Sequence, residues 1–391
     1  MVLVLRLGDP AESETYAGAL RDLFVGSESG GGTSFGPKEL LQAGEFRELT
    51  VTGDPAAAVQ ALDFLDSADR LLAIALDARV SAPPARGVNT SLEQALVDAV
   101  LDAALDRAIV LSVSLKHAGS LHDVAGESPG VLRLGLEDLE ERDLRLPFLT
   151  LYALHHALRL FAAPSSGGAG KAARLFLSHA KRDGVPLTKA FRGFMTELKG
   201  FDSFYDTNDL DLNGDIDLQL STAVASAVVI VFRSDVFDQR YWCQKEVLWA
   251  EQHGRPVITV DARWHIEHAP SLVSFDSTPV VRIPDGNVIR ICMTALIEAL
   301  RVALFDERAD AHATALGVLK YNIPRCPSLV SLHQACADLK RQRQASSGPE
   351  AYVVYPNPSL PTAMAAAAEG LAQFAVDRCH VVSLDEFRLL A

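Results

Sequence analysis

The chain has 391 residues, of which 49% are hydrophobic and 22% charged, so we expect a globular protein long enough for two or three domains. Its formal net charge is -14 and no block of lysines or arginines occurs, which argues against nucleic acid or an anionic membrane surface as a main partner. No apolar run is long enough to span a membrane, and the five cysteines lack paired spacing, so we expect a cytoplasmic protein with reduced thiols and no metal site.

The first 162 residues alternate short apolar runs with helical patterns. Strands are predicted at 2–7, 70–76, 108–113 and 130–136, and helices at 11–26, after Asp54, after Thr90 and at 149–161. Apolar strands separated by helices predict a parallel sheet covered on both faces, in a Rossmann-like α/β domain. No dinucleotide fingerprint follows any strand. His155 and His156 are successive helix residues that face different sides, which argues against a shared metal site.

Residues 163–173, rich in glycine and serine, predict a linker before a second α/β domain at 174–308. Its strands are expected at 174–180, 201–206, 228–233 and 256–261, and its helices at 186–199, 218–227, 242–254 and 288–306. Residues 309–391 predict a small α/β extension with strands at 351–356 and 380–384.

The stretch "DLDLNGDIDLQL", residues 209–220, is close to the sequence of a calcium loop. Such a loop needs a helix on both sides and a bidentate glutamate at its twelfth position, which is Leu220 here. The segment before it alternates like a strand. The carboxylates instead suit a solvated loop in which Gly214 allows a turn and Asp215 caps the next helix. We therefore expect no calcium site.

Four segments of the second domain resemble, in the correct order, the motifs of a bacterial Toll/interleukin-1 receptor (TIR) domain. They are "LFLSHAKRDG" (175–184), "SFYDTNDLDLNGDI" (203–216), "VVIVFRSDVFDQRYWCQKEV" (228–247) and "PVITVD" (256–261). The resemblance covers about a third of the chain and implies a flavodoxin-like parallel sheet. Its second segment would contain the long acidic loop of the family, the BB loop.

In TIR domains that are enzymes, the reaction cleaves the bond between nicotinamide and ribose in NAD⁺. The resemblance places the catalytic carboxylate at Glu246, although a glutamate on a helix is also, by itself, an ordinary exposed residue. NAD⁺ is the substrate and no cofactor is expected. The remaining substrate-binding candidates are Ser178, His179, Asp206, Asp209 and Trp242.

Several of these candidates have alternative roles. Asp206 and Asp209 could contact ribose hydroxyls or only cap and solvate the loop. Trp242 could form a wall of the nicotinamide pocket or anchor its helix in the core. Cys243 has no evident base beside it, so we expect it to pack in the core.

The resemblance also implies assembly, because the BB loop of TIR domains contacts a neighbouring domain. The candidate assembly residues are Asp211, Asn213, Gly214 and Asp215. We expect a homo-oligomer or filament, with residues 1–162 sensing a trigger ligand or protein or supporting assembly. The setting implied is bacterial antiphage immunity. Two alternatives stay open, namely a non-enzymatic TIR scaffold and a nucleoside or nucleotide N-glycosidase of related topology.

Overall fold

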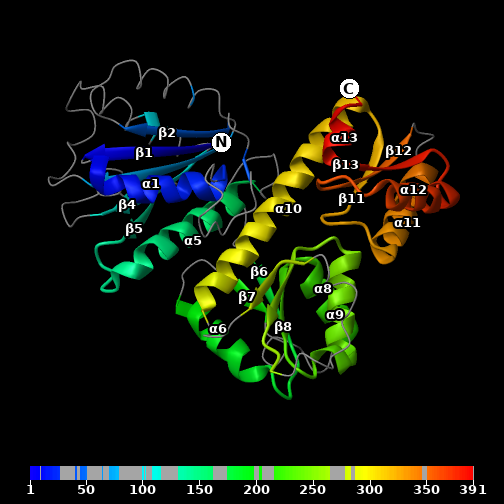
Figure 1. Cartoon of the computed structure of the whole chain (residues 1–391), viewed down its shortest axis with the longest axis horizontal. Coiled ribbons are helices and arrows are strands. Elements are labelled where there is room, and N and C mark those ends of the chain that lie inside the picture. The colour runs from blue at the N-terminus through cyan, green and yellow to red at the C-terminus, as the bar shows by residue number, and fades with distance from the viewer. Residues whose placement is uncertain are drawn as a thin grey trace. The chain divides into compact units, whose positions relative to one another are not determined.

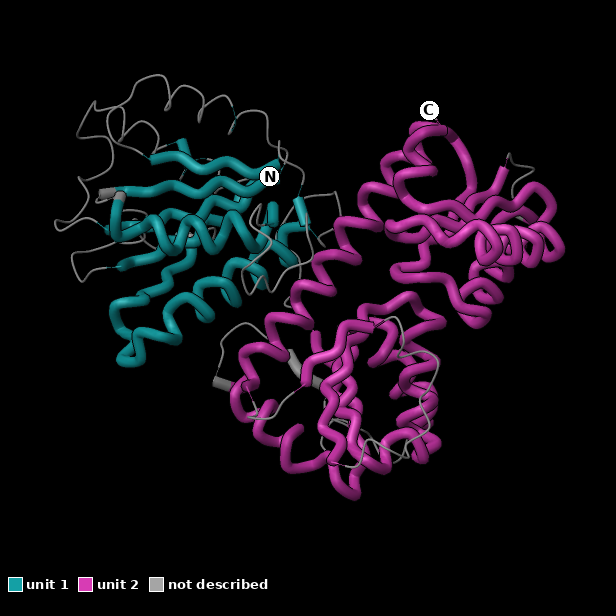
Figure 2. Tube along the Cα trace, in the orientation of Figure 1, with its two compact units in different colours: residues 1–172 teal, residues 173–391 magenta. Residues whose placement is uncertain are grey.

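The computed structural model describes residues 1–8, 10–26, 40–41, 45–50, 64, 70–78, 99–100, 102, 108–115, 131–161, 174–197, 202–204, 215–264, 278–282, 287–345 and 350–390. The chain forms two compact units, residues 1–172 and residues 173–391 (Figure 2). Among the described residues, no helix is long and apolar enough to cross a membrane.

The first unit contains a parallel sheet with strand order β2-β1-β3-β4-β5. Its strands are β1 (Val2–Gly8), β2 (Phe46–Thr50), β3 (Leu71–Ala78), β4 (Ala108–Ser114) and β5 (Val131–Gly135). Helices α1 (Pro10–Phe24) and α5 (Arg142–Phe161) pack against one another and against the sheet (Figure 1). Strands β3 and β4 are buried along their whole length, as expected for the centre of a parallel sheet.

The four strands predicted in this unit are confirmed, but two elements differ from expectation. Strand β2 was not predicted, because only the first of its five residues is buried and its apolar and polar residues do not alternate. Helix α5 starts seven residues before the predicted start at 149 and contains Pro147, which normally interrupts a helix. The helices expected after Asp54 and after Thr90 lie mostly outside the described residues, as does the linker at 163–173.

The histidine pair of α5 is buried, with His155 2% and His156 5% exposed. The two rings lie edge to face with centroids 5.0 Å apart, so the side chains touch although they belong to successive residues of the helix. Burial lowers the pKa of His155 to about 4 and that of His156 to about 3. Both imidazoles are therefore neutral at physiological pH.

The second unit begins with another parallel sheet, ordered β10-β9-β8-β6-β7. Its strands are β6 (Arg174–His179), β7 (Asp202–Phe204), β8 (Val228–Arg233), β9 (Val257–Asp261) and β10 (Val280–Arg282). Its helices are α6 (Val185–Glu197), α8 (Ile216–Ala225), α9 (Tyr241–Gln252) and α10 (Val288–Leu316), with a short 3-10 helix, η2 (Phe237–Gln239). The second strand of this sheet, β7, lies on one side of β6, and the third, β8, lies on the other side. The first unit has the same arrangement, with β2 and β3 on opposite sides of β1.

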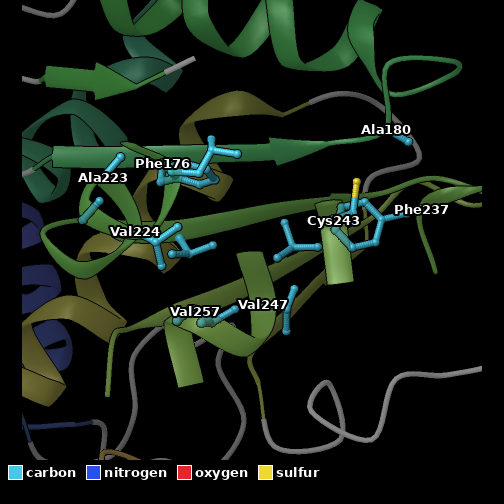
Figure 3. Close-up of a cluster of buried hydrophobic side chains, with 13 residues drawn as sticks. Phe176, Ala180, Ala223, Val224, Phe237, Cys243, Val247 and Val257 are labelled. Atoms are coloured by element: carbon cyan, nitrogen blue, oxygen red, sulfur yellow. The ribbon is translucent and has the colours of Figure 1, made fainter. Parts of the chain in front are cut away.

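The core between this sheet and helices α8 and α9 is apolar. Figure 3 shows Phe176 of β6, Val224 of α8, Val247 of α9 and Phe237 of η2 meeting there. Cys243 belongs to the same cluster and is 4% exposed, which confirms its packing role. Helices α6 and α10 also contact one another, α6 packing on β6 and α10 on β8 and β9.

The last part of the chain forms a three-stranded parallel sheet in the order β11-β12-β13. Its elements are β11 (Leu319–Asn322), α11 (Leu329–Ala345), β12 (Ala351–Tyr355), α12 (Thr362–Ala375), β13 (Cys379–Ser383) and α13 (Leu384–Arg388). We call residues 318–390 the C-terminal lobe. The strands predicted at 351–356 and 380–384 are confirmed, whereas β10 and β11 were missed because they are short and incompletely buried.

The C-terminal lobe and the sheet of β6–β10 share helix α10 and contact one another at the end of α9. The predicted domain boundary between 308 and 309 falls inside α10, which continues to Leu316 and ends at Gly317 with a left-handed φ of 64°. The Ser328 hydroxyl hydrogen-bonds the Glu251 carboxylate, and Arg325 donates to the Arg255 carbonyl at 2.9 Å. The lobe therefore holds the carboxyl-terminal end of α9 in place.

Candidate active site

Helix α9 presents one face to the sheet and carries Glu246 on it. The buried residues of the helix are Cys243, Glu246, Val247, Ala250 and Glu251. Glu246 is only 6% exposed, so the alternative that it is an ordinary exposed helix residue is wrong. Burying a carboxylate costs free energy unless hydrogen bonds compensate it, and its surroundings therefore decide what it can do.

Ser178 provides such a hydrogen bond to Glu246. This serine lies near the carboxyl end of β6 and is 1% exposed, and its Oγ donates to Glu246 Oε2 at 2.5 Å. The bond crosses from the sheet to the helix between residues 68 positions apart. It fixes the carboxylate close to the place where the strand order reverses, between β6 and β8, which is where open α/β sheets bind ligands.

His179 follows Ser178 directly on β6. Successive strand residues point to opposite faces of a sheet, and because Ser178 faces α9, His179 faces away from it. The His179 ring is 6% exposed, with Nδ1 3.2 Å from the Leu177 carbonyl oxygen. A Cβ added to Gly184 would lie 3.1 Å from the His179 Cβ. This packing places the ring beside the turn that follows β6.

The turn after β6 is tied to the turn after β8 by Asp183. Its carboxylate accepts hydrogen bonds from the Ser234 hydroxyl and, at 3.3 Å, from the Val236 amide. Gly184 suits this close approach, because a Cβ would lie only 3.0 Å from the Ala180 carbonyl oxygen. The turn that follows Ser178 is therefore held both by the hydrogen bonds of Asp183 and by the close packing at Gly184.

Two paired arginines mark the same edge of the sheet. Arg233 and Asp238 form a buried ion pair after β8, with Nε 3.1 Å from Oδ1. After β9, Arg263 donates to both carboxylate oxygens of Asp261, at 2.7 and 2.8 Å. This hydrogen bonding lowers the pKa of Asp261 and raises that of Arg263. The Asp261 carboxylate is therefore held ionised by a guanidinium.

Trp264 is a candidate that the sequence analysis missed. It lies three residues after the end of β9, is 90% exposed, and its backbone N–H donates to Asp235 Oδ1 at 2.9 Å. Strands of one sheet lie about 4.8 Å apart, so β9, two strands away, lies roughly 10 Å from β6. A tryptophan shortly after a predicted strand was the available signal, because open α/β sheets bind ligands at the carboxyl ends of their strands and ligand pockets are lined largely by apolar and aromatic side chains.

Trp242 is not a core anchor, since it is 42% exposed. The Lys245 Nζ lies 5.1 Å from the ring centroids of Tyr241, Trp242 and Trp249. It also pairs with Asp217 of α8 at 2.6 Å, and this hydrogen bond raises the pKa of Lys245. Tyr241 and Trp242 are exposed at the surface of α9 next to Lys245, whereas Trp249 is partly buried and packs against the apolar core.

The predicted acidic loop lies almost wholly outside the described residues, including Asp206, Asp209, Asp211, Asn213 and Gly214. Asp215 is described and caps α8, its Oδ1 accepting from the Leu218 amide at 3.2 Å, which confirms that expectation. Leu220, at the twelfth position of the calcium-like pattern, is 3% exposed in the core beneath α8. Within the described part of the chain, no group of three or more metal-ligating residues occurs.

No protein-family model matches this chain, and a search of curated proteins found no significant match.

Proposed function

We propose that this chain is a TIR-type enzyme that cleaves the nicotinamide–ribose bond of NAD⁺. The observation that carries the proposal is the buried Glu246 carboxylate, hydrogen-bonded by Ser178 at the carboxyl edge of a parallel sheet. A further support is the strand order, in which the second strand lies outside the first, as in flavodoxin-like folds. The order of the four sequence motifs supports it independently.

The chemistry requires little more than one well-placed carboxylate. Nicotinamide leaves as a neutral molecule, because the electron pair of the breaking C–N bond returns to a positively charged ring nitrogen. No general acid is needed. The ribose carbon acquires oxocarbenium character, and the Glu246 anion stabilises that charge more strongly in the transition state than in the ground state. Ser178 holds the carboxylate in one orientation throughout, which avoids reorganisation during the reaction.

The acceptor decides the product. When water attacks the ribose carbon, a C–O bond forms, one proton passes to solvent, and the products are nicotinamide and ADP-ribose. When an adenine nitrogen of the same molecule attacks, the product is a cyclic ADP-ribose. The described residues provide one candidate for the distal half of the substrate, because Trp264, shortly after β9, has an exposed ring on which an adenine could stack.

Assembly is part of the proposal. Large apolar side chains are exposed on helices α8 and α9, namely Ile216, Leu218, Tyr241, Trp242 and Leu248. Apolar surface gathered on neighbouring helices is typical of a protein contact. The BB loop leads directly into α8, so a head-to-tail contact between copies, extending to a filament, would use both. Residues 1–162 would sense a trigger or support the assembly, in the cytoplasm of a bacterium defending itself against phage.

A substrate panel tests this function against its rivals. Purified full-length chain is incubated separately with NAD⁺ and with deoxynucleosides at several protein concentrations, and released bases are measured by chromatography. We expect nicotinamide from NAD⁺, rising more steeply than linearly with protein concentration. Release of bases from deoxynucleosides alone would identify a nucleoside N-glycosidase. No release from any substrate would leave a TIR scaffold, for which a buried glutamate at this position has no evident use.

A further inference from the structure

Helix α12 of the C-terminal lobe buries one side and exposes an apolar side. Its inward side includes Ala368 and Ala372, which pack in the lobe's core under strands β12 and β13. On the outward side Met364 is 51%, Leu371 49% and Phe374 94% exposed. The helix lies at the outside of the lobe (Figure 1).

The exposed residues form one continuous surface, which we call the α12 face. Its members are Ala363, Met364, Ala366, Ala367, Gly370, Leu371 and Phe374. At about 100° per residue they cover an arc of roughly 160° with Phe374 near its centre. The carboxylate of Glu369 lies outside this arc, because it accepts hydrogen bonds from Gln373 and, at 3.0 Å, pairs with the His380 ring. The α12 face is therefore free of charge.

Gly370 has no evident purpose within the lobe. A Cβ at this position would meet nothing within 4 Å, and glycine inside a helix costs about 1 kcal/mol relative to alanine. Its backbone has ordinary helical geometry, so no left-handed conformation requires it. A glycine between exposed alanines permits another helix to approach closely.

The sequence of α12 is complementary to itself when reversed. In an antiparallel pair centred between Ala368 and Glu369, two large residues meet small ones, because Phe374 faces Ala363 and Leu371 faces Ala366. The small residues Gly370 and Ala367 face one another near the centre, and Met364 faces Gln373. Such reciprocal contacts are the property of a two-fold interface. We propose that the α12 face binds the same face of a second copy of this chain as an antiparallel helix pair. This contact is independent of the proposed NAD⁺ chemistry and of the head-to-tail contact.

The net charge of the chain and the exposed area of the α12 face both support a second copy of this chain as the partner. The chain carries a net charge of -14, so two copies repel one another over most of their surface. Contact through an uncharged face gives the least electrostatic repulsion. The three large side chains expose on the order of 400 Å² per copy, about half of what each partner contributes to a standard stable interface. We therefore expect a weak dimer that forms as protein concentration rises.

Sedimentation velocity of the full chain over a wide concentration range tests the proposal. The perturbing variant is Phe374→Glu, which alters a residue 94% exposed and therefore should not affect folding. The matched control is Leu389→Glu, which removes another large exposed side chain, 83% exposed, from the same lobe. We expect association at least tenfold weaker for Phe374→Glu than for wild type, and unchanged for Leu389→Glu.

A complementary-charge pair distinguishes a second copy from any other occupant. Ala363→Lys alone should also weaken association. Mixing Ala363→Lys chains with Phe374→Glu chains should restore a dimer, because the heterodimer places lysine opposite glutamate and keeps one native contact. Wild type that stays monomeric at every concentration would overturn the proposal, as would Phe374→Glu associating like wild type. Failure of the mixture to recover association would show that α12 does not pair with itself.

Discussion

The sharpest prediction concerns Glu246→Gln. Glutamine is nearly isosteric and its side-chain oxygen can still accept the Ser178 hydrogen bond, so only the charge is lost. A unit charge about 4 Å from a developing positive charge contributes about 4 kcal/mol at an effective dielectric constant of 20. Removing it should slow nicotinamide release about a thousandfold. Glu246→Ala should be equally inactive but less stable, because it also leaves a cavity and a buried serine without its acceptor.

The assay is single-turnover nicotinamide release from NAD⁺, with thermal melting to verify folding. The matched control is Glu251→Gln, the other buried glutamate of α9, which is 7% exposed and bonded to Ser328 in the C-terminal lobe. Glu251 lies more than one helical turn from Glu246. The Glu251→Gln protein should therefore release nicotinamide at nearly the wild-type rate per folded molecule. A folded Glu246→Gln protein with near-normal turnover would refute the role of the carboxylate.

Further outcomes are expected from three other perturbations. Ser178→Ala should lower kcat about tenfold with little change in KM, since a hydrogen bond to a charged group contributes about 1.5–3 kcal/mol, and should cost nothing further in a Glu246→Gln background. The neutral imidazoles of His155 and His156 have folded pKa values near 4 and 3, below the unfolded value of about 6.5, so the stability of residues 1–161 is complete above that pH and falls as pH drops. Each should contribute about 2 kcal/mol of destabilisation at pH 5, measurable by urea titration, and His156→Leu should reduce the slope. Calcium should not raise the melting temperature, because Leu220 packs in the core; a rise of several degrees would show a site in the acidic loop.

The buried centres of the sheets were predictable from sequence, because continuous apolar runs such as 70–76 and 228–233 have few alternative structures. The edges were not. Strands β2, β10 and β11 are short and partly exposed, so their residues need not be apolar, and only pairing with a neighbouring strand defines them. Helices α5 and α10 exceed their predicted lengths because tertiary contacts extend them past the local signals.

The candidate site, like the fold, was predictable from the sequence only in part. Glu246 and Ser178 were both selected from local motifs, but the bond between them depends on how α9 packs across β6, which no local pattern contains. The alternation of side chains on β6 directs Ser178 and His179 to opposite faces of the sheet, although they are adjacent in sequence. Trp242 lies one turn from Glu246, yet its 42% exposure follows from the edge of the helix that it occupies. Burial, more than residue type, distinguished these candidates.

Direct measurement of NAD⁺ consumption tests the central claim. Purified full-length wild type and Glu246→Gln are incubated with NAD⁺ at the highest attainable protein concentration, and NAD⁺, nicotinamide and ADP-ribose products are followed by chromatography. We expect wild type to release one nicotinamide for each NAD⁺ lost, with a linear or cyclic ADP-ribose as the second product, and Glu246→Gln to leave NAD⁺ intact. Unchanged NAD⁺ with folded, concentrated wild-type protein would contradict the claim, as would equal consumption by both proteins.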